Sequence, residues 1–498
     1  MSEKPEIKES KAEVNKRNSR FLRGTVADSL ATDTSHFSDS DEGVLKFHGV
    51  YQQDDRDVRH ERRKKKEEEA WQFMARCAIP AGVLTADQYL ALDRIADDHA
   101  NGTLRITTRQ GIQFHGVIKK NLKSTIKRIN QALVTTLSAC GDVERNVMAC
   151  PAPLCDETHV MVRKAAREIA TQLRPATKAY HEIWLNGEKD STTEDHEPFY
   201  GPQYLPRKFK TAIALPGDNC VDVYSYDLGL IAITEHERLV GYNVLVGGGM
   251  GMTHGKPDTV ATLAEPLGYV SAEHVVDAAR TVAAIFRDFG NRADRRHARI
   301  KYVILERGIE WCREEFRKRA LFPLEPSRPL PPMEFHDHLG KNRQDDDLWF
   351  YGLFIENGRI RDNAAGGMKS VLREIVAKYR PGVALTPHQN LLFTGLRETD
   401  ADAIEKTLVT SGIKPAVELS AARRFSMACP ALPTCGLAMA ESERIMPSVV
   451  DAFEAELASL GLRDEPLTMR MTGCPNGCAR PYTADIAFVG RKPDVYHV

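Results

Sequence analysis

The sequence lacks the features that would place it in a membrane, outside the cell or on a nucleic acid. No apolar run approaches the roughly twenty residues of a membrane-spanning helix, and the N-terminus has no apolar signal segment. Cysteine is scarce, with 10 in 498 residues, which favours a reducing, cytoplasmic location over a disulfide framework. Neither charge dominates, with 68 basic and 69 acidic residues, so no global field attracts nucleic acid or membrane.

A dinucleotide-binding fingerprint is also missing. The glycine-rich stretch GGGMG at 247–251 lacks the third glycine of G-x-G-x-x-G and follows no clear βαβ start. Its glycines indicate a close approach of the backbone to another group instead. The chain is therefore not expected to bind NADPH itself.

The length and the 42% hydrophobic content allow two to four domains with large cores. Residues 1 to about 40 are polar and are predicted to form an extended or disordered arm. The basic run from Arg59 to Lys66 is followed by Glu67 to Glu69, which predicts an exposed, ion-paired helix rather than a nucleic-acid site. A helix is expected after an N-cap at Thr85, and a strand pair over 103–118.

An internal repeat is the most informative pattern in the chain. The segment LRITTRQGIQFHG at 104–116 matches VALTPHQNLLFTG at 383–395, and RNVMACPAP at 145–153 matches RFSMACPAL at 424–432. Both matches have the same offset of 279 residues (383 − 104 and 424 − 145). The chain is therefore predicted to be a duplicated unit with pseudo-two-fold symmetry and a shared site between the copies.

Four cysteines in two close pairs dominate the C-terminal part of the sequence: Cys429, Cys435, Cys474 and Cys478. Proline and glycine around them stiffen both loops, as expected for a four-thiolate iron–sulfur or zinc site. Five and three residues separate the paired cysteines, which fits an iron–sulfur cluster better than structural zinc, although zinc stays open. The first copy has only Cys150 and Cys155 at the matching place, and these are expected to be buried and not to bind a metal.

Cationic residues gather in the first copy and in the αβ region that follows it. They are Arg76, Arg105, Arg109, Arg145, Arg207, Lys208 and Lys210. Lys208 and Lys210 point to one face if YLPRKFK is a strand. Alone, this stretch would suit a solvated sheet edge, but beside the repeat-linked arginines it indicates a site for a polyanion.

Seven motifs make the chain resemble the sulfite and nitrite reductase family: FHGVYQQDDRD, TTRQGIQFHG, RNVMAC, YLPRKFK, LVGGGMG, SMACPALPTC and MTGCPNGC. The first of them favours the hemoprotein (beta) subunits of assimilatory NADPH-dependent sulfite reductases. The resemblance implies an α+β fold: duplicated ferredoxin-like halves at 71–135 and 341–415, α/β siroheme- and cluster-binding domains at 136–340 and 416–498, and a partner-docking arm at 1–70.

The resemblance further implies one [4Fe–4S] cluster on Cys429, Cys435, Cys474 and Cys478, with Cys478 bridging to the iron of one siroheme. The implied contacts to siroheme and its carboxylates are Arg105, Arg109, Gln113, His115, Arg207 and Asn476. The residues implied around the substrate anion are Arg76, Arg145, Lys208 and Lys210.

The activity implied is the six-electron reduction of sulfite to sulfide in sulfate assimilation and cysteine biosynthesis. NADPH, FAD and FMN would act in a flavoprotein (alpha) partner. Nitrite reduction and ferredoxin-dependent sulfite reduction are the alternatives, and a zinc-binding scaffold or a truncated remnant would be a different class. The remnant is weighed because family members continue past the last cysteine pair, whereas this chain stops at Val498, so its C-terminal domain is expected to be truncated.

Overall fold

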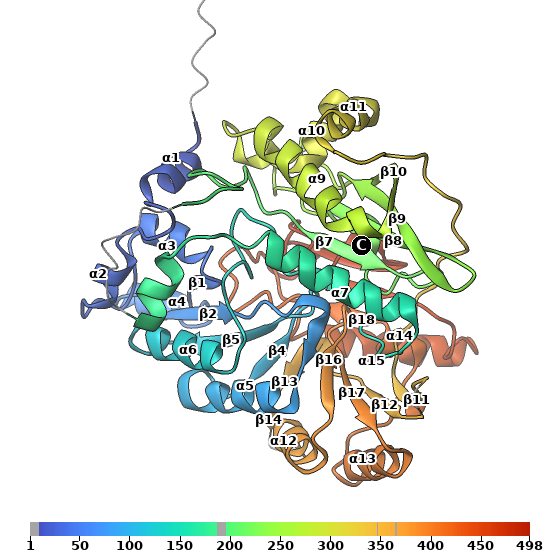
Figure 1. Cartoon of the computed structure of the whole chain (residues 1–498). Coiled ribbons are helices and arrows are strands. Elements are labelled where there is room, and N and C mark those ends of the chain that lie inside the picture. The colour runs from blue at the N-terminus through green and yellow to red at the C-terminus, as the bar shows by residue number, and fades with distance from the viewer. Residues whose placement is uncertain (1–8, 187–195, 346, 364–365) are drawn as a thin grey trace, which may run out of the picture.

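The computed structural model describes residues 9–186, 196–345, 347–363 and 366–498 (Figure 1). Within these ranges the strands form three five-stranded sheets, one four-stranded sheet and one two-stranded sheet. No helix within them combines the length and the apolar character that a membrane crossing requires.

The first copy of the repeat builds an antiparallel sheet covered by two helices. The strand order is β1 (Val50–Asp54), β2 (Trp71–Arg76), β5 (Ile112–Val117), β4 (Leu104–Ile106) and β13 (Arg359–Ile360). The helices are α5 (Ala86–His99) and α6 (Lys119–Gln131). A capping box starts α5, because Thr85 Oγ1 accepts from the backbone N–H of Gln88 while the Gln88 side chain accepts from that of Thr85. The predicted helix and strand pair are confirmed.

The second copy builds the same unit. Its strand order is β11 (Gly340–Arg343), β12 (Trp349–Leu353), β17 (Leu391–Leu396), β16 (Gly382–Leu385) and β3 (Val83–Leu84), and its helices are α12 (Met368–Tyr379) and α13 (Glu398–Thr410). The two units lie next to each other in the lower half of Figure 1, blue and orange, with α5 packed against α12.

Each copy completes the sheet of the other. Strand β13 from the second copy pairs with β4, and β3 from the first copy pairs with β16. Two buried glutamines repeat this exchange: Gln110 Nε2 donates to Leu385 O (2.9 Å), and Gln389 Nε2 donates to Ile106 O (3.4 Å). These contacts carry the same 279-residue offset, so the pseudo-two-fold axis predicted from the repeat passes between them.

The larger α/β unit follows the first copy in the chain. Its sheet has the order β10 (Glu265–Ser271), β9 (Arg238–Val246), β8 (Leu228–Glu235), β7 (Thr211–Ala214) and β6 (Met148–Ala149). Its helices are α7 (Glu157–Gln172), α9 (Val275–Phe289), α10 (Ile300–Arg307) and α11 (Ile309–Arg319). The smaller unit has β18 (Ser426–Ala428), β19 (Met469–Thr472), β20 (Ile486–Lys492) and β21 (Val495–His497) with α14 (Ala421–Arg424) and α15 (Met446–Ser459).

The two α/β units are related in the same way as the copies. Strands β6, β7 and β8 are parallel neighbours and β9 returns antiparallel, and β18, β19, β20 and β21 repeat this order and these directions. Because parallel strands end at one edge, the loops after β18 and β19 come together, as do those after β6 and β7.

The prediction of an extended or disordered arm over residues 1–40 is wrong for the part that the structure describes. Residues 9–64 contain α1 (Lys11–Asn18), α2 (Val26–Leu30), α3 (Asp39–Leu45), β1 and α4 (Arg59–Lys64). Leu22, Val26 and Phe37 are buried in the main core. These few apolar side chains anchor the segment, although its overall composition is polar. Residues 1–8 lie outside the described residues.

Candidate functional site

The four C-terminal cysteines converge at the strand ends of the smaller α/β unit. Cys429 directly follows β18 and Cys474 lies two residues after β19. Burial, and after it the nearby Cys478 thiol, raises the pKa of Cys474 to about 11. The same two causes raise the pKa values of Cys429 and Cys435. Cys478 therefore acts electrostatically on each of the other three thiols.

Polar hydrogens point at these sulfurs. The backbone N–H of Gly473 donates to Cys429 Sγ (3.4 Å), and Asn476 Nδ2 donates to Cys474 Sγ (3.3 Å). No disulfide bond joins cysteines among the residues that the structure describes. N–H donors aimed at sulfur stabilise thiolates and tune iron–sulfur clusters, and a bound metal cation offsets the burial that keeps the thiols protonated. This donor set fits a [4Fe–4S] cluster.

The N-terminal segment braces this loop, a contact that sequence reasoning missed. Arg56 Nη1 donates to the carbonyl oxygens of Cys435 (3.0 Å) and Ala438 (2.5 Å), and Arg56 N–H donates to Pro433 O (3.2 Å). Arg56 lies in the quoted motif FHGVYQQDDRD, which was the available signal.

In the sheet of the first copy, four side chains form a row across β2, β5, β4 and β13: Arg76, Gln113, Arg105 and Arg359. The side-chain oxygen of Gln113, oriented to satisfy its neighbours, accepts from Arg76 at 2.6 and 3.1 Å. Arg105 donates to Glu443 Oε2 (2.8 Å) and to Ala428 O (2.9 Å), directly before Cys429. The row joins the first copy to the cysteine loop.

Glu443 is the anionic partner of this row. Burial acts to raise the pKa of Glu443, but the charges of Arg359 and Arg105 outweigh it and lower the pKa to about 2. Glu443 N–H donates to Cys429 O (3.1 Å). Sequence reasoning missed both Glu443 and Arg359, and no spacing pattern marks either residue.

A recess lies where the first copy meets the two α/β units. The predicted residues that line it are Arg109, Lys208, Lys210, Asn476 and Cys478. The Cys478 side chain is exposed into this recess, whereas Cys429 and Cys474 are buried. The recess thus brings cations from the first half of the chain against the last of the four cysteines.

Lys208 and Lys210 are half-buried and have no hydrogen-bond acceptor or ion-pair partner among the residues that the structure describes. Burial, followed by the charges of Lys210 and Arg207, lowers the pKa of Lys208 well below its usual value. Burial, followed by the charges of Arg109 and Arg299, does the same to the pKa of Lys210. An anion placed here would therefore be strongly favoured, because it would relieve the repulsion among these cations.

Arg145 and Arg207 lie at the edge of the same cationic group. Arg145 donates from Nε (3.1 Å) and Nη2 (3.0 Å) to Gly141 O, and Arg207 pairs with Asp142 (3.7 Å). Their charges also act on Lys208. Arg76 Nη1 donates to Cys140 Sγ (3.1 Å). Burial acts to lower the pKa of Arg76, but Cys140, Tyr51 and then Cys478 outweigh it and raise that pKa.

His115 is buried, 1% exposed, and neither ring nitrogen has a hydrogen-bond partner among the described residues. Burial, followed by the charges of Arg359 and Arg105, lowers the pKa of His115 well below its usual value. A neutral, unpaired imidazole beside the arginine row is a polar group that a bound cofactor could satisfy.

Two further arginines line the recess and were not singled out from the sequence. Arg299 forms a bidentate pair with Asp227 (2.7 and 2.7 Å), and Arg480 pairs with Asp222 (2.5 Å). Arg480 stands two positions after Cys478, which was a usable signal, whereas nothing in the sequence marks Arg299.

Two smaller expectations can now be compared with the structure. Gly251 of the glycine-rich stretch passes so close to the backbone of Asn476 that an added Cβ would lie 3.2 Å from its carbonyl oxygen. Close backbone approach is thus found, here against the cysteine loop. Cys155 is exposed, so the expectation that it is buried is wrong, whereas Cys150 is buried as expected.

Comparison with known proteins agrees with this geometry. A family model described as "Nitrite and sulphite reductase 4Fe-4S domain" matches residues 140–323, and one described as "Nitrite/Sulfite reductase ferredoxin-like half domain" matches residues 65–132 and 341–410. The predicted α+β fold with duplicated ferredoxin-like halves is confirmed.

Full-length relatives share nearly half of the residues. The chain is 47% identical to a protein from Staphylococcus saprophyticus (97% of this chain, 85% of the relative) and 47% identical to one from Myxococcus xanthus (98% and 87%). Both are named sulfite reductase (NADPH) hemoprotein beta-component. The solved structure of Mycobacterium tuberculosis NirA protein is similar, with a TM-score of 0.80 and 26% identity over 97% of this chain and 84% of that one. The chain belongs to the nitrite and sulfite reductase family.

Proposed function

We propose that this chain is the hemoprotein (beta) component of an NADPH-dependent sulfite reductase, which reduces sulfite to sulfide with six electrons. The observation that carries the proposal is the recess that Lys208 and Lys210, without partners among the described residues, line together with Cys478. A thiolate cluster site and an anion site thus share one wall.

The cofactors proposed are one siroheme and one [4Fe–4S] cluster, and the residues present fit both. The four cysteines would hold the cluster, and Cys478 alone among them opens into the recess. Arg109 and Asn476 line this recess, and the charge of Arg207 acts on Lys208 within it. Guanidinium and amide groups suit the carboxylates of siroheme. When bound, these groups supply electron transfer and an iron atom that binds the substrate.

The chain's own residues supply charge and protons. Lys208, Lys210 and Arg145 would hold an anionic substrate, whose negative charge raises the pKa of both lysines toward the protonated form. A protonated Nζ beside a leaving oxygen can both stabilise its developing charge and donate a proton. Arg76, which interacts electrostatically with Cys478, would add a permanent positive charge.

The sequence has no dinucleotide-binding fingerprint, which supports placing the oxidation of NADPH in another protein. We propose a flavoprotein (alpha) partner that carries FAD and FMN and oxidises NADPH. The names of the relatives, which describe a beta component of an NADPH enzyme, support a second component and NADPH as the source of electrons. Docking through residues 1–70 stays a prediction. The small number of cysteines, 10 in 498 residues, supports a cytoplasmic location, where thiols stay reduced.

The test is substitution of Lys210 by methionine, which keeps the length of the side chain and removes its charge. Lys210→Met is expected to keep the iron and siroheme content and to lower sulfite turnover by about a hundredfold or more. Lys123→Met, an exposed lysine on α6, is the matched control and should be fully active. Sulfide is measured with reduced methyl viologen as electron donor.

Full activity of Lys210→Met would overturn the role given to the recess. Nitrite is assayed with the same donor because it takes the same number of electrons. Ammonia from nitrite without sulfide from sulfite would overturn the substrate assignment and leave the cofactor assignment intact.

A further inference from the structure

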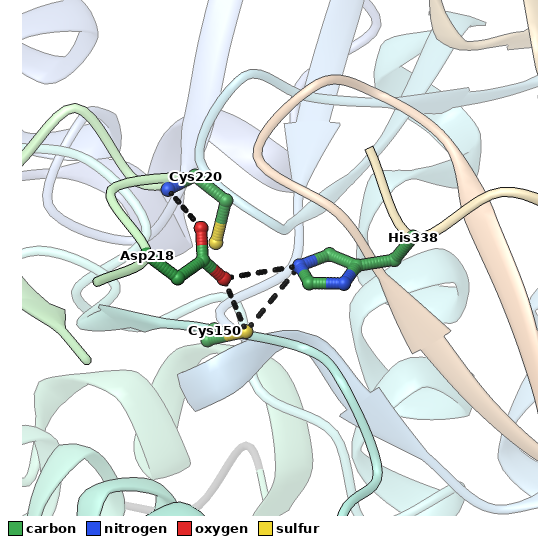
Figure 2. Close-up of side chains that lie close together, drawn as sticks. All are labelled: Cys150, Asp218, Cys220 and His338. Carbon is green, nitrogen blue, oxygen red and sulfur yellow. Dashed lines mark hydrogen bonds and ion pairs between the residues drawn. The ribbon is translucent and has the colours of Figure 1, made fainter. Parts of the chain in front are cut away.

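A second group of metal-binding side chains lies outside the recess. Cys150, Asp218, Cys220 and His338 each direct one potential ligand atom to a common point, and these four atoms all lie within 4.8 Å of one another (Figure 2). They come from three separate segments, since Cys150 follows β6, Asp218 and Cys220 follow β7, and His338 precedes β11.

Three separations within this group match the edges of a coordination tetrahedron. Cys150 Sγ lies 3.3 Å from Asp218 Oδ2 and 3.4 Å from His338 Nε2, and the latter two atoms are 3.3 Å apart. Ligands at zinc-like bond lengths of about 2.0 Å for N and O and 2.3 Å for S give edges of about 3.3–3.8 Å. Three ligand atoms thus have the spacing that one ion requires, and the Cys220 sulfur, within 4.8 Å of each of them, would be the fourth ligand.

The fold explains why a metal site stands at this place. Cys150 directly follows β6 as Cys429 directly follows β18, and the loops after β7 and β19 supply the next ligands in each half. The position of this group therefore corresponds, across the pseudo-two-fold axis, to that of the four cysteines. The first half has two cysteines, one aspartate and one histidine where the second half has four cysteines.

We propose that Cys150, Asp218, Cys220 and His338 bind a single zinc ion whose role is structural. Two sulfur donors favour zinc over magnesium or calcium, which take oxygen ligands. Four protein ligands complete a tetrahedron and leave no position for substrate, as in structural zinc sites. The ion would fasten the segment before β11, at the start of the second copy, to the strand ends of the larger α/β unit.

The surroundings suit a bound cation. Cys150 and Cys220 are each 1% exposed, and Asp218 is 8% exposed. The second carboxylate oxygen of Asp218 accepts from the backbone N–H of Cys220 (2.9 Å) and lies 3.5 Å from His336 Nδ1, so one oxygen is held in place and the other faces the ligand group. The ligands therefore have the supporting contacts that fix a metal site.

The test is metal analysis of the purified holoenzyme from cells grown with zinc, after gel filtration in EDTA. We expect about one zinc per chain, and zinc-edge X-ray absorption should show two sulfur and two nitrogen or oxygen ligands. His338→Ala and Cys220→Ala should each lower zinc about tenfold or more, with iron and siroheme unchanged. Cys155→Ala, five residues from Cys150 and exposed, is the matched control and should keep its zinc.

The zinc proposal is tested by zinc content, whereas the sulfite reductase assignment is tested by iron content and activity, so the failure of one can be distinguished from the failure of the other. Wild-type protein without zinc would overturn it, as would zinc bound by four sulfurs, which would place the ion at Cys429 and its neighbours. A peptide map with Cys150 and Cys220 joined by a disulfide would also overturn it. The wild-type spectrum decides the question even if the variants do not fold.

Discussion

The buried carboxylate of Asp222 is expected to hold the two halves of the chain together. It accepts from Arg480 Nε (2.5 Å) and pairs with Arg470 Nη1 (2.9 Å), and all three side chains are at most 7% exposed. Asp222 and Arg480 occupy matching places, because each has a left-handed backbone just before the short helix that leads into β8 or β20. Their ion pair therefore joins the larger α/β unit to the cysteine-bearing unit.

Replacing Asp222 by asparagine keeps the volume and leaves two buried guanidinium groups without a counter-charge. Breaking one buried pair costs about 3–5 kcal/mol, and because both arginines share one carboxylate the two losses do not add. Asp222→Asn should therefore lower the free energy of unfolding by about 3–5 kcal/mol. The exposed pair of Asp57 with Arg444 (2.6 Å) is the matched control, and Asp57→Asn should cost less than about 1 kcal/mol.

Urea unfolding followed by tryptophan fluorescence measures both variants. Burial acts to raise the pKa of Asp222, but Arg470 and Arg480 lower it below its ordinary value. The stabilisation by this ion pair is thus present above the unfolded-state pKa of about 4 and is lost as the pH falls further. The difference in free energy of unfolding between the wild type and Asp222→Asn should therefore narrow below about pH 4. A cost below about 1 kcal/mol at pH 7, or a gap that widens in acid, would refute the reasoning.

Two further predictions concern buried polar groups. Gln389→Leu removes the acceptor of the Ala428 N–H (3.2 Å) beside Cys429. This variant should lower the free energy of unfolding by about 1–3 kcal/mol and should also lower the iron content. Gln110→Leu removes the corresponding acceptor in the first copy and should lower the free energy of unfolding by a similar amount, with the iron content retained. Equal iron loss in both variants would contradict this. Burial raises the pKa of Glu144 to about 8. The free energy of unfolding of the wild type should therefore fall, relative to that of Glu144→Gln, as the pH rises from about 4.3 to 8. Urea unfolding across this pH range measures both proteins, and parallel curves for the two would contradict the prediction.

Much of the site could be predicted because its signals are local. The cysteine pairs and their glycines and prolines lie within short segments, and the constant offset of the repeat places Gln110 and Gln389 in corresponding positions. The sequence predicts that Lys208 and Lys210 belong to an anion site because several arginines occur in the repeat segments. The structure places both lysines in the recess beside Cys478.

The remaining features depend on contacts between distant segments. Asp218, Cys220 and His338 lie 68, 70 and 188 residues from Cys150, and no spacing pattern relates them. The packing of residues 9–40 was missed because composition averages over a segment, while anchoring depends on a few apolar side chains such as Leu22. Both the ligand group around Cys150 and the packing of residues 9–40 depend on which side chains are buried together, and this follows from the tertiary fold.

The most direct test of the account is a joint determination of iron, acid-labile sulfide and siroheme in the purified chain. A cluster on Cys429, Cys435, Cys474 and Cys478 together with one siroheme predicts about five iron atoms, four sulfides and one siroheme per chain. Cys474→Ala should lose the sulfide, whereas Cys312→Ala, a buried cysteine elsewhere in the chain, should keep it. A colourless protein without acid-labile sulfide would contradict the account.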